Sequence, residues 1–151
     1  QIQAGLAQLA PVAGRLAPVR AQSGARLIDD SYNANPESVI AAMGVLLAAP
    51  GRRTLVLGDL GELGPEQEQL HRELGQRAAE AGIERLFTCG ELSRHASDSF
   101  AGESRHFDTS EALIDHLGSS LGSGDSVLIK GSRASLMDRV VAALRAGEQA
   151  C

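Results

Sequence analysis

Hydrophobic residues change their spacing along the chain, and this change predicts alternating strands and helices. Apolar runs typical of buried strands occur at 26–29, 54–57, 86–89 and 127–130, with a weaker run at 105–107. Apolar residues recur every three or four positions, as on one helix face, over 36–47, 65–81, 108–121 and 136–144, and a short helix is expected at 93–97. The alternation predicts an α/β fold with a mostly parallel sheet.

Turn and capping residues predict where several helices begin and end. Asn35 has the character of an N-cap with Pro36 at the first helical position, and Gly82 has that of a C-cap. Asp108 and Glu111 have the spacing of a capping box. Helices are therefore expected to begin after residues 35 and 108, and one is expected to end at residue 82.

The start of the chain differs from the rest. Ile2, Leu6 and Leu9 have helical spacing, and prolines and glycines then punctuate a loop-like stretch as far as residue 24. The length of 151 residues suits one domain with its own core. We therefore expect residues 1–14 to be the tail of a preceding domain with its linker, and residues 15–151 to form one domain of a longer protein.

Composition and charge argue against several classes of protein. The net charge is -5 without a basic run, which disfavours a nucleic-acid binder, and no apolar run approaches the ~20 residues of a membrane span. Cys89 and Cys151 lie far apart and form neither a zinc motif nor a disulfide framework, so we expect a reducing, cytoplasmic location. Among 14 basic residues the sole lysine is Lys130, which indicates either a site that needs a compact ammonium or the chance survival of an ordinary residue.

The first candidate site follows the strand at 26–29, since ligands of parallel sheets bind beyond the carboxyl ends of strands. Here the run Asp29–Pro36 brings two carboxylates, a hydroxyl, a phenol and two amides together before a helix. A carboxylate accepts hydrogen bonds from ribose hydroxyls, and amides and helix N–H groups face phosphates. The alternative is that Asn35 is simply a helix cap and the two aspartates a polar strand end.

Two further strand ends carry candidate binding residues. In the loop Gly58–Gly64, glycine recurs every third residue and permits close approach of a ligand, although this is not the dinucleotide fingerprint; the alternative is a tight turn with exposed acids. His71 follows in the next helix, either as a structural residue or as a substrate contact. The run Lys130–Arg133 has two cations and a hydroxyl before a helix, which is typical of an anion site; the alternative is a solvated helix start.

Several catalytic motifs are missing from the sequence. It contains no phosphate-binding P-loop, no His-Glu-x-x-His, no cysteine pair for zinc and no Gly-x-Ser-x-Gly elbow. The sequence therefore predicts half of an active site.

The three strand ends, in this order and spacing, resemble the C-terminal domain of the Mur ligases. The resemblance covers nearly the whole chain and rests on Gly14-Arg15, Asp29–Pro36, Gly58–Gly64, His71 and Lys130–Arg133. It is strongest to the member that adds D-alanyl-D-alanine, because the run Asp29–Pro36 is specific to that ligase. It implies a Rossmann-like three-layer sandwich with one antiparallel strand, near residues 16–20, preceded at 1–14 by the tail of the central domain.

The resemblance also implies a reaction and its partners. The family member is a cytoplasmic ATP-dependent ligase of peptidoglycan precursor synthesis, in which a UDP-muramyl tripeptide is activated as an acyl phosphate and attacked by the dipeptide amine. ATP and Mg²⁺ are the implied cofactors. The P-loop and the magnesium ligands are expected in the central domain, so this chain is expected to be inactive without the missing N-terminal and central domains.

Site residues follow from the same resemblance. The implied ATP-binding residues are Arg15, Asp30, Tyr32, Asn33 and Asn35. Position and charge suggest, for D-alanyl-D-alanine, the candidates Asp59, Glu62, His71, Lys130, Ser132 and Arg133.

Other readings remain open beside this one. They are a non-catalytic nucleotide-binding module, a sister Mur or folylpolyglutamate ligase domain and, with the wrong glycine spacing, a nicotinamide-dependent oxidoreductase.

Overall fold

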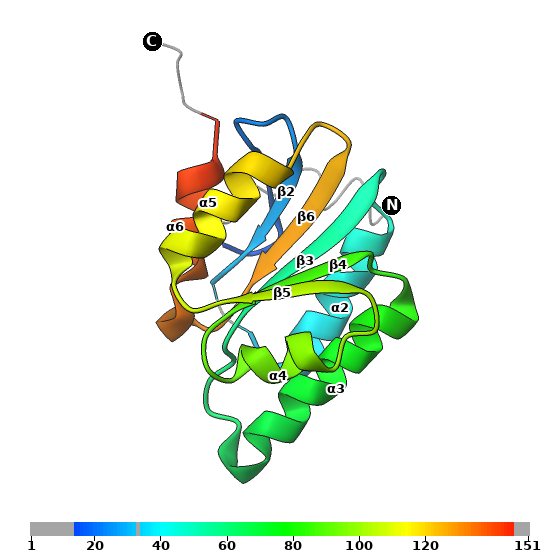
Figure 1. Ribbon diagram of the computed structural model, residues 1–151, viewed down its shortest axis with the longest axis vertical. Helices are drawn as coiled ribbons and strands as arrows, with labels where there is room; N and C mark the ends of the chain where they lie inside the picture. The colour runs from blue at the N-terminus through cyan, green and yellow to red at the C-terminus, as the bar shows by residue number, and fades with distance from the viewer. Residues whose placement is uncertain (1–13, 33, 147–151) are drawn as a thin grey trace, which may run out of the picture.

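The computed structural model describes residues 14–32 and 34–146, and in this part of the chain six strands form one sheet (Figure 1). The strand order is β1-β2-β6-β3-β4-β5, and β1 is antiparallel to β2 while the other neighbouring pairs are parallel. The strands are β1 (Ala17–Arg20), β2 (Arg26–Asp30), β3 (Arg52–Gly58), β4 (Arg85–Cys89), β5 (Glu103–Phe107) and β6 (Asp125–Lys130).

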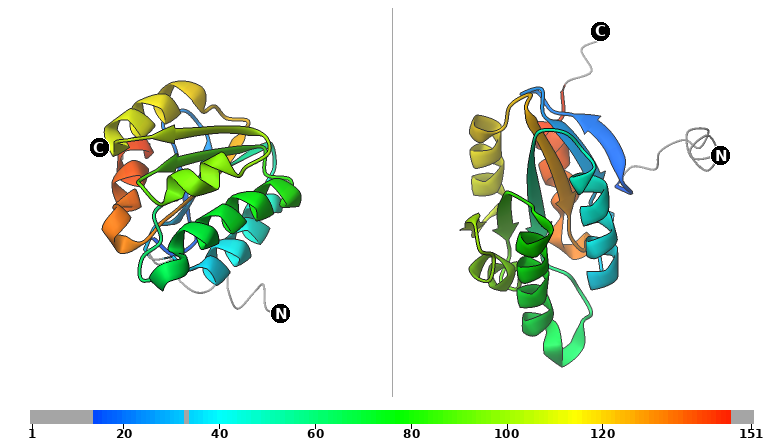
Figure 2. Two further views of the ribbon diagram at one scale, coloured as in Figure 1. Left: turned by 60° about the horizontal axis from the view of Figure 1, so that its bottom comes forward. Right: turned by 90° about the vertical axis from the view of Figure 1, so that its right-hand side faces the viewer.

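Helices cover both faces of this sheet, which confirms the predicted three-layer sandwich with one antiparallel strand. The helices are α2 (Pro36–Leu47), α3 (Gln67–Ala81), α4 (Ser93–Asp98), α5 (Ser110–Ser120) and α6 (Met137–Leu144), with 3₁₀ turns at Gly64–Glu66 and Arg133–Ser135. The left view of Figure 2 shows α5 and α6 on one side of the sheet and α2 and α3 on the other. The chain changes sides when α5 leads back from the edge strand β5 to β6 in the middle.

Each face of the sheet has its own apolar core because side chains alternate along the strands. Val56, Val127 and Ile129 pack in the cluster that includes α5 and α6, whereas Leu55 and Leu128 pack in the cluster that includes α2 and α3. The central strands β3 and β6 are therefore apolar on both sides, as the continuous hydrophobic runs predicted.

Most predicted helix ends agree with the structure, but one does not. Asn35 is the N-cap of α2 and Gly82 ends α3 in a left-handed conformation, as expected. The cap of α5 is Thr109 rather than Asp108, because the Thr109 side chain accepts the Ala112 N–H. The run Lys130–Arg133 does not itself lie at the start of a helix, since a 3₁₀ turn begins at Arg133 and α6 begins at Met137, within the helix predicted at 136–144.

Two further expectations concern the ends of the chain and the membrane. The helical spacing at 1–9 and most of the expected linker lie outside the described residues. No helix in residues 14–32 and 34–146 combines the length and the apolar character needed to cross a membrane.

This topology brings the three candidate strand ends together. The strands β2, β6 and β3 are consecutive in the sheet and run parallel, so their carboxyl ends lie side by side at one edge. The loops that follow them carry the three polar clusters found in the sequence.

Candidate nucleotide and dipeptide site

The two aspartates that end β2 serve different faces of the sheet, since neighbouring strand residues point to opposite sides. The Asp29 carboxylate accepts hydrogen bonds from the Gly14 N–H (3.2 Å) and from the N–H and hydroxyl of Ser31 (3.2 and 2.5 Å). These contacts fix the turn after β2 and bring residue 14 against it. Asp29 is therefore a structural residue of this turn, whereas Asp30 lies on the α2 side.

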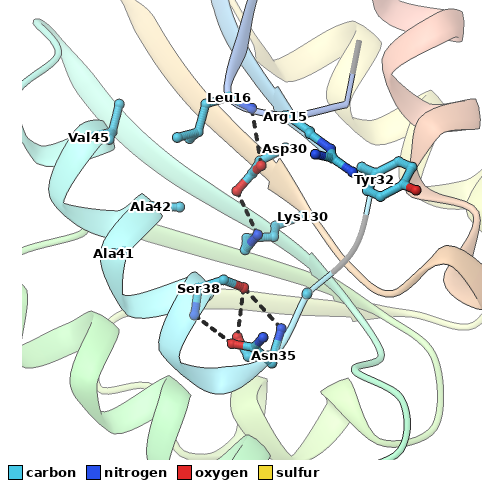
Figure 3. Close-up of a pocket in the computed structure, with 11 residues that line it drawn as sticks. Arg15, Leu16, Asp30, Tyr32, Asn35, Ser38, Ala41, Ala42, Val45 and Lys130 are labelled. Carbon is cyan, nitrogen blue, oxygen red and sulfur yellow. Dashed lines mark hydrogen bonds and ion pairs between the residues drawn. The ribbon is translucent and has the colours of Figure 1, made fainter. Parts of the chain in front are cut away.

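Asp30 forms a buried ion pair with Lys130 (Figure 3). The two residues are partners in the register of β2 and β6, and the Lys130 Nζ lies 2.6 Å from Asp30 Oδ2. The other carboxylate oxygen accepts the Leu16 N–H at 3.1 Å. Asp30 is thus held from two sides, by the edge segment before β1 and by the central strand β6.

The ion pair lies at one wall of a hollow of about 530 Å³, which we call the Asp30 hollow. Arg15, Tyr32 and Asn35 also line it, and Figure 3 shows these side chains around the pair. The rest of the wall is formed by Ser38 and by the small or apolar residues Leu16, Ala34, Ala41, Ala42 and Val45. One hollow therefore presents a carboxylate, cations and an apolar surface together.

Tyr32 links this hollow to its neighbours through two cation–π contacts. The guanidinium carbon of Arg15 lies 4.1 Å from the centre of the Tyr32 ring, and that of Arg133 lies 5.1 Å from it. The backbone N–H of Tyr32 donates to the Gly14 carbonyl at 2.7 Å, so the ring is placed by the turn that Asp29 organises.

Asn35 has a structural duty as well as a place in the hollow. Its side-chain oxygen accepts the Ser38 N–H at 2.8 Å, and its own N–H donates to the Ser38 hydroxyl at 3.0 Å, which completes a capping box. Asn33, expected in the ATP group, lies outside the described residues.

A second hollow of about 510 Å³, the Arg133 hollow, lies between the loops after β3 and β6. Glu62 and Arg133 give it charges of opposite sign, and both are exposed. Ser132 and Asn35 also line it, and Asn35 thereby borders both hollows. This geometry fits a small zwitterion, because one ligand end faces a carboxylate and the other a guanidinium.

The expected dipeptide contact Asp59 instead holds three loops in place. Its carboxylate accepts the N–H groups of Leu92 (3.1 Å) and Ser93 (2.7 Å), at the beginning of α4. Its backbone carbonyl accepts the Ser132 N–H at 2.9 Å. Asp59 therefore connects the loops that follow β3, β4 and β6, and it does not line the Arg133 hollow.

His71 is likewise committed within the protein. It is 0% exposed, its Nδ1 lies 2.7 Å from the Gln67 carbonyl, and its Nε2 accepts the Leu60 N–H at 3.1 Å. Burial lowers the pKa of His71, while the bond to Gln67 acts in the opposite direction. The neutral His71 ring therefore anchors the loop Gly58–Gly64 through the Leu60 N–H. His71 lines neither the Asp30 hollow nor the Arg133 hollow.

The structure divides the predicted substrate group differently from the sequence. Ser132, Arg133 and Glu62 come together in the Arg133 hollow, but Lys130 lies with Asp30 in the other hollow. The apolar wall of Leu16, Ala41, Ala42 and Val45 was not predicted from the sequence. The one available signal was the pair of small residues at 41 and 42 on α2. The sequence pattern does not show which face of this helix meets a ligand and which meets the core.

In residues 14–32 and 34–146, no group of three or more His, Cys, Asp or Glu side chains is placed to hold a metal ion.

Comparison with known proteins assigns a domain with this sheet order, buried aspartate and β6 loop to a family of ligases. The family model described as "Mur ligase, glutamate ligase domain" matches residues 14–133, so the chain belongs to this family. Individual members of this family are more similar to the chain and carry a more specific name. The UDP-N-acetylmuramoyl-tripeptide–D-alanyl-D-alanine ligase of Escherichia coli is 44% identical over 146 residues, which are 95% of this chain and 32% of that protein.

Solved structures show the same domain. MurF from Acinetobacter baumannii is 32% identical with a TM-score of 0.79, over 92% of this chain and 31% of that one. MurF from Thermotoga maritima in complex with ADP is 32% identical with a TM-score of 0.77, over 91% and 32% of the two chains. The chain thus spans about a third of the length of the relatives it matches.

Proposed function

We propose that this domain serves an ATP-dependent ligase of the cytoplasm that adds D-alanyl-D-alanine to UDP-N-acetylmuramoyl-tripeptide in peptidoglycan precursor synthesis. The observation that carries the proposal is the pair of neighbouring hollows at the carboxyl ends of β2, β6 and β3. One has the chemistry for a nucleotide and the other has the charges for a dipeptide. The Escherichia coli relative is named as a ligase for D-alanyl-D-alanine.

The Asp30 hollow supports the nucleotide part of the proposal. The Asp30 carboxylate suits ribose hydroxyls, Arg15 suits phosphate, and the apolar wall with Leu16 and Val45 suits a flat base. Tyr32 adds an exposed aromatic face beside Arg15. We keep Asn33 and Asn35 in this group from the resemblance.

The Arg133 hollow supports the dipeptide part. Arg133 would hold the dipeptide carboxylate, with the Ser132 hydroxyl beside it, and Glu62 would face the ammonium. Asp59 and His71 support the loops that form this hollow and do not contact the ligand themselves.

In the reaction, the tripeptide carboxylate takes the γ-phosphate of ATP and becomes an acyl phosphate. The dipeptide amine then attacks the acyl carbon, a peptide bond forms and phosphate leaves. The P-loop and the magnesium that accompanies ATP would be supplied by the other domains of the ligase. This domain would close over them and shield the acyl phosphate from water until both substrates are bound.

The test is a titration of the isotope-labelled chain followed by amide chemical shifts, which detect weak binding. D-alanyl-D-alanine should shift residues 61–63 and 132–134, and ADP should shift residues around Asp30. L-alanyl-L-alanine is the control and should give smaller shifts. ADP shifts without any dipeptide response would remove the dipeptide assignment and favour a non-catalytic nucleotide-binding module. If the chain and the full-length ligase responded to neither ligand, the whole proposal would be wrong.

A further inference from the structure

The sole lysine of the chain occupies a closed position at the end of the central strand β6. Lys130 is 2% exposed, and its ammonium reaches across the sheet to Asp30 on β2. Its neighbours in sequence, Ser132 and Arg133, line the Arg133 hollow, whereas Lys130 lines the Asp30 hollow (Figure 3). The basic residue is therefore separated from the proposed dipeptide contacts.

The hydrogen bonds of Asp30 leave part of its carboxylate for a ligand. A carboxylate has about four lone-pair positions on its two oxygens. The Leu16 N–H uses one on Oδ1, and the Lys130 ammonium uses one on Oδ2. Since Asp30 lines the hollow, its remaining positions are available to hydroxyl donors from that side.

A lysine suits this place better than an arginine. A guanidinium is flat, with five donors that require several acceptors, whereas an ammonium is compact. The buried Arg85 shows the difficulty: its Nε donates to the Thr54 hydroxyl (3.0 Å), but its Nη2, 3.5 Å from Asp125 in an ion pair, has no hydrogen-bond partner among the described residues. At residue 130 a larger group would push into the hollow that Asp30 lines.

We propose that Lys130 is a positioning residue for nucleotide recognition: it holds the Asp30 carboxylate so that its free lone pairs face the two ribose hydroxyls of ATP. This inference rests on the proposed function and moves Lys130 from the dipeptide group to the nucleotide group. Lys130 acts through Asp30 and does not itself contact the nucleotide.

The experiment uses the full-length ligase and compares ATP with 2′-deoxy-ATP and 3′-deoxy-ATP. In the parent enzyme, the KM for the weaker of the two deoxynucleotides should be about ten times the KM for ATP, as expected for loss of a hydrogen bond to a charged group. The quantity compared between variants is this ratio of the two KM values. In Lys130→Met this ratio should fall to about one, while the KM for D-alanyl-D-alanine stays within about twofold. A ratio of KM values does not depend on how much of the preparation is folded.

Four further variants separate a positioning role of Lys130 from other roles. Asp30→Asn should abolish the same ratio, and Asp30→Asn/Lys130→Met should lower it no further, because the two residues act as one unit. Lys130→Arg should retain only part of the preference for ATP. Arg85→Met breaks a buried ion pair at the other end of the sheet and should leave the ratio as in the parent enzyme.

Specific results would overturn this inference. An unchanged ratio in Lys130→Met would show that Asp30 needs no support from the lysine. A tenfold rise in the KM for D-alanyl-D-alanine with an unchanged ratio would return Lys130 to the dipeptide site. If the parent enzyme formed no ADP from ATP, the proposed function itself would be wrong, and that result is distinct from either of these.

Discussion

The two ends of strand β6 carry buried ionic residues that have different surroundings. At the amino end, Asp125 accepts hydrogen bonds from Arg52 (2.8 Å) and from the Gly122 N–H (2.8 Å), and Arg85 lies 3.5 Å away. At the carboxyl end, Lys130 pairs with Asp30 beside a hollow of about 530 Å³. The same strand therefore begins at a carboxylate surrounded by protein groups and ends at an ion pair that borders a hollow.

The two ends differ in which groups form hydrogen bonds with the buried carboxylate. Around Asp125 the partners come from the starts of β3 and β4 and from the turn before β6, so protein groups alone satisfy the carboxylate. Around Asp30 the protein supplies a backbone N–H and an ammonium, and the hollow supplies room for a ligand. A buried ion pair thus indicates a binding site when a cavity borders it, and a structural element when none does.

The strongest test of this contrast is Asp125→Ala. The change leaves the buried Arg85 without its carboxylate, and breaking a buried pair in this way costs about 3–5 kcal/mol. Urea unfolding of the chain should show this loss, while the ATP preference of the full-length ligase should match the parent. A loss of stability below about 1 kcal/mol would contradict the structural role assigned to the amino end.

The second test concerns the open end. Arg133→Met should raise the KM for D-alanyl-D-alanine about tenfold or more, because a charged hydrogen bond to the dipeptide carboxylate is lost. The matched control is Arg139→Met, an exposed arginine of α6 that does not line the Arg133 hollow. Steady-state kinetics of the full-length ligase measures both. Equal effects of the two variants would remove Arg133 from the proposed site.

A third, smaller effect is expected from the loop support beneath that hollow. Asp59→Ala removes the acceptor for two N–H groups at the beginning of α4 and should cost about 1 kcal/mol. Asp108→Ala is the control, since its exposed ion pair with Arg94 also contacts α4 but contributes little. Thermal unfolding of the chain compares them, and equal Tm values would argue against Asp59 as the support.

The sequence predicted the fold well where apolar spacing determined it. The continuous run at 127–130 gave a central strand, and strand β2 and helix α2 followed from a short run and the Asn35-Pro36 pair. The mostly parallel sheet also places the three strand ends at one edge, but only the observed order β2-β6-β3 makes them neighbours. The predicted features depend on local pattern, which a single sequence contains.

Side-chain partners across the sheet were harder to predict. Lys130 and Arg133 are three residues apart in the sequence, yet they line different hollows, because Lys130 still belongs to the strand and faces α2. Asp59 and His71 are residue types that often bind ligands, so the sequence suggested them as contacts. In the structure, Asp59 binds the Ser93 N–H, and His71 binds Leu60 and Gln67. These partners are set by the packing of loops and helices, which the sequence pattern does not show. Only the register of β2 against β6 shows that Asp30 meets Lys130.

The smallest predicted effect is a difference in how stability depends on pH at the two ends of strand β6. Burial lowers the pKa of His71 from its usual 6.5, so below that pH the unfolded chain binds more protons and this part of the stability is lost. His106 and His116 act in the same direction, since burial lowers the pKa of each. Burial alone would raise the pKa of Asp125, but hydrogen bonds from Arg52 and Gly122 lower it below 3.8, so its contribution is lost only in stronger acid.

The carboxyl end should therefore loosen first as the pH falls. Protonation of His71 removes the acceptor for the Leu60 N–H, so hydrogen-exchange protection of Leu60 should fall as the pH is lowered below 6.5, with a Tm change of about 4 °C or less. Protection of the Asp125 amide, bonded to the Gly122 carbonyl, should persist over that range. In His71→Gln the pH dependence at Leu60 should disappear, because the side chain no longer titrates. If Leu60 lost protection equally in this variant, another group would control the glycine loop, and His71 would be a packing residue alone.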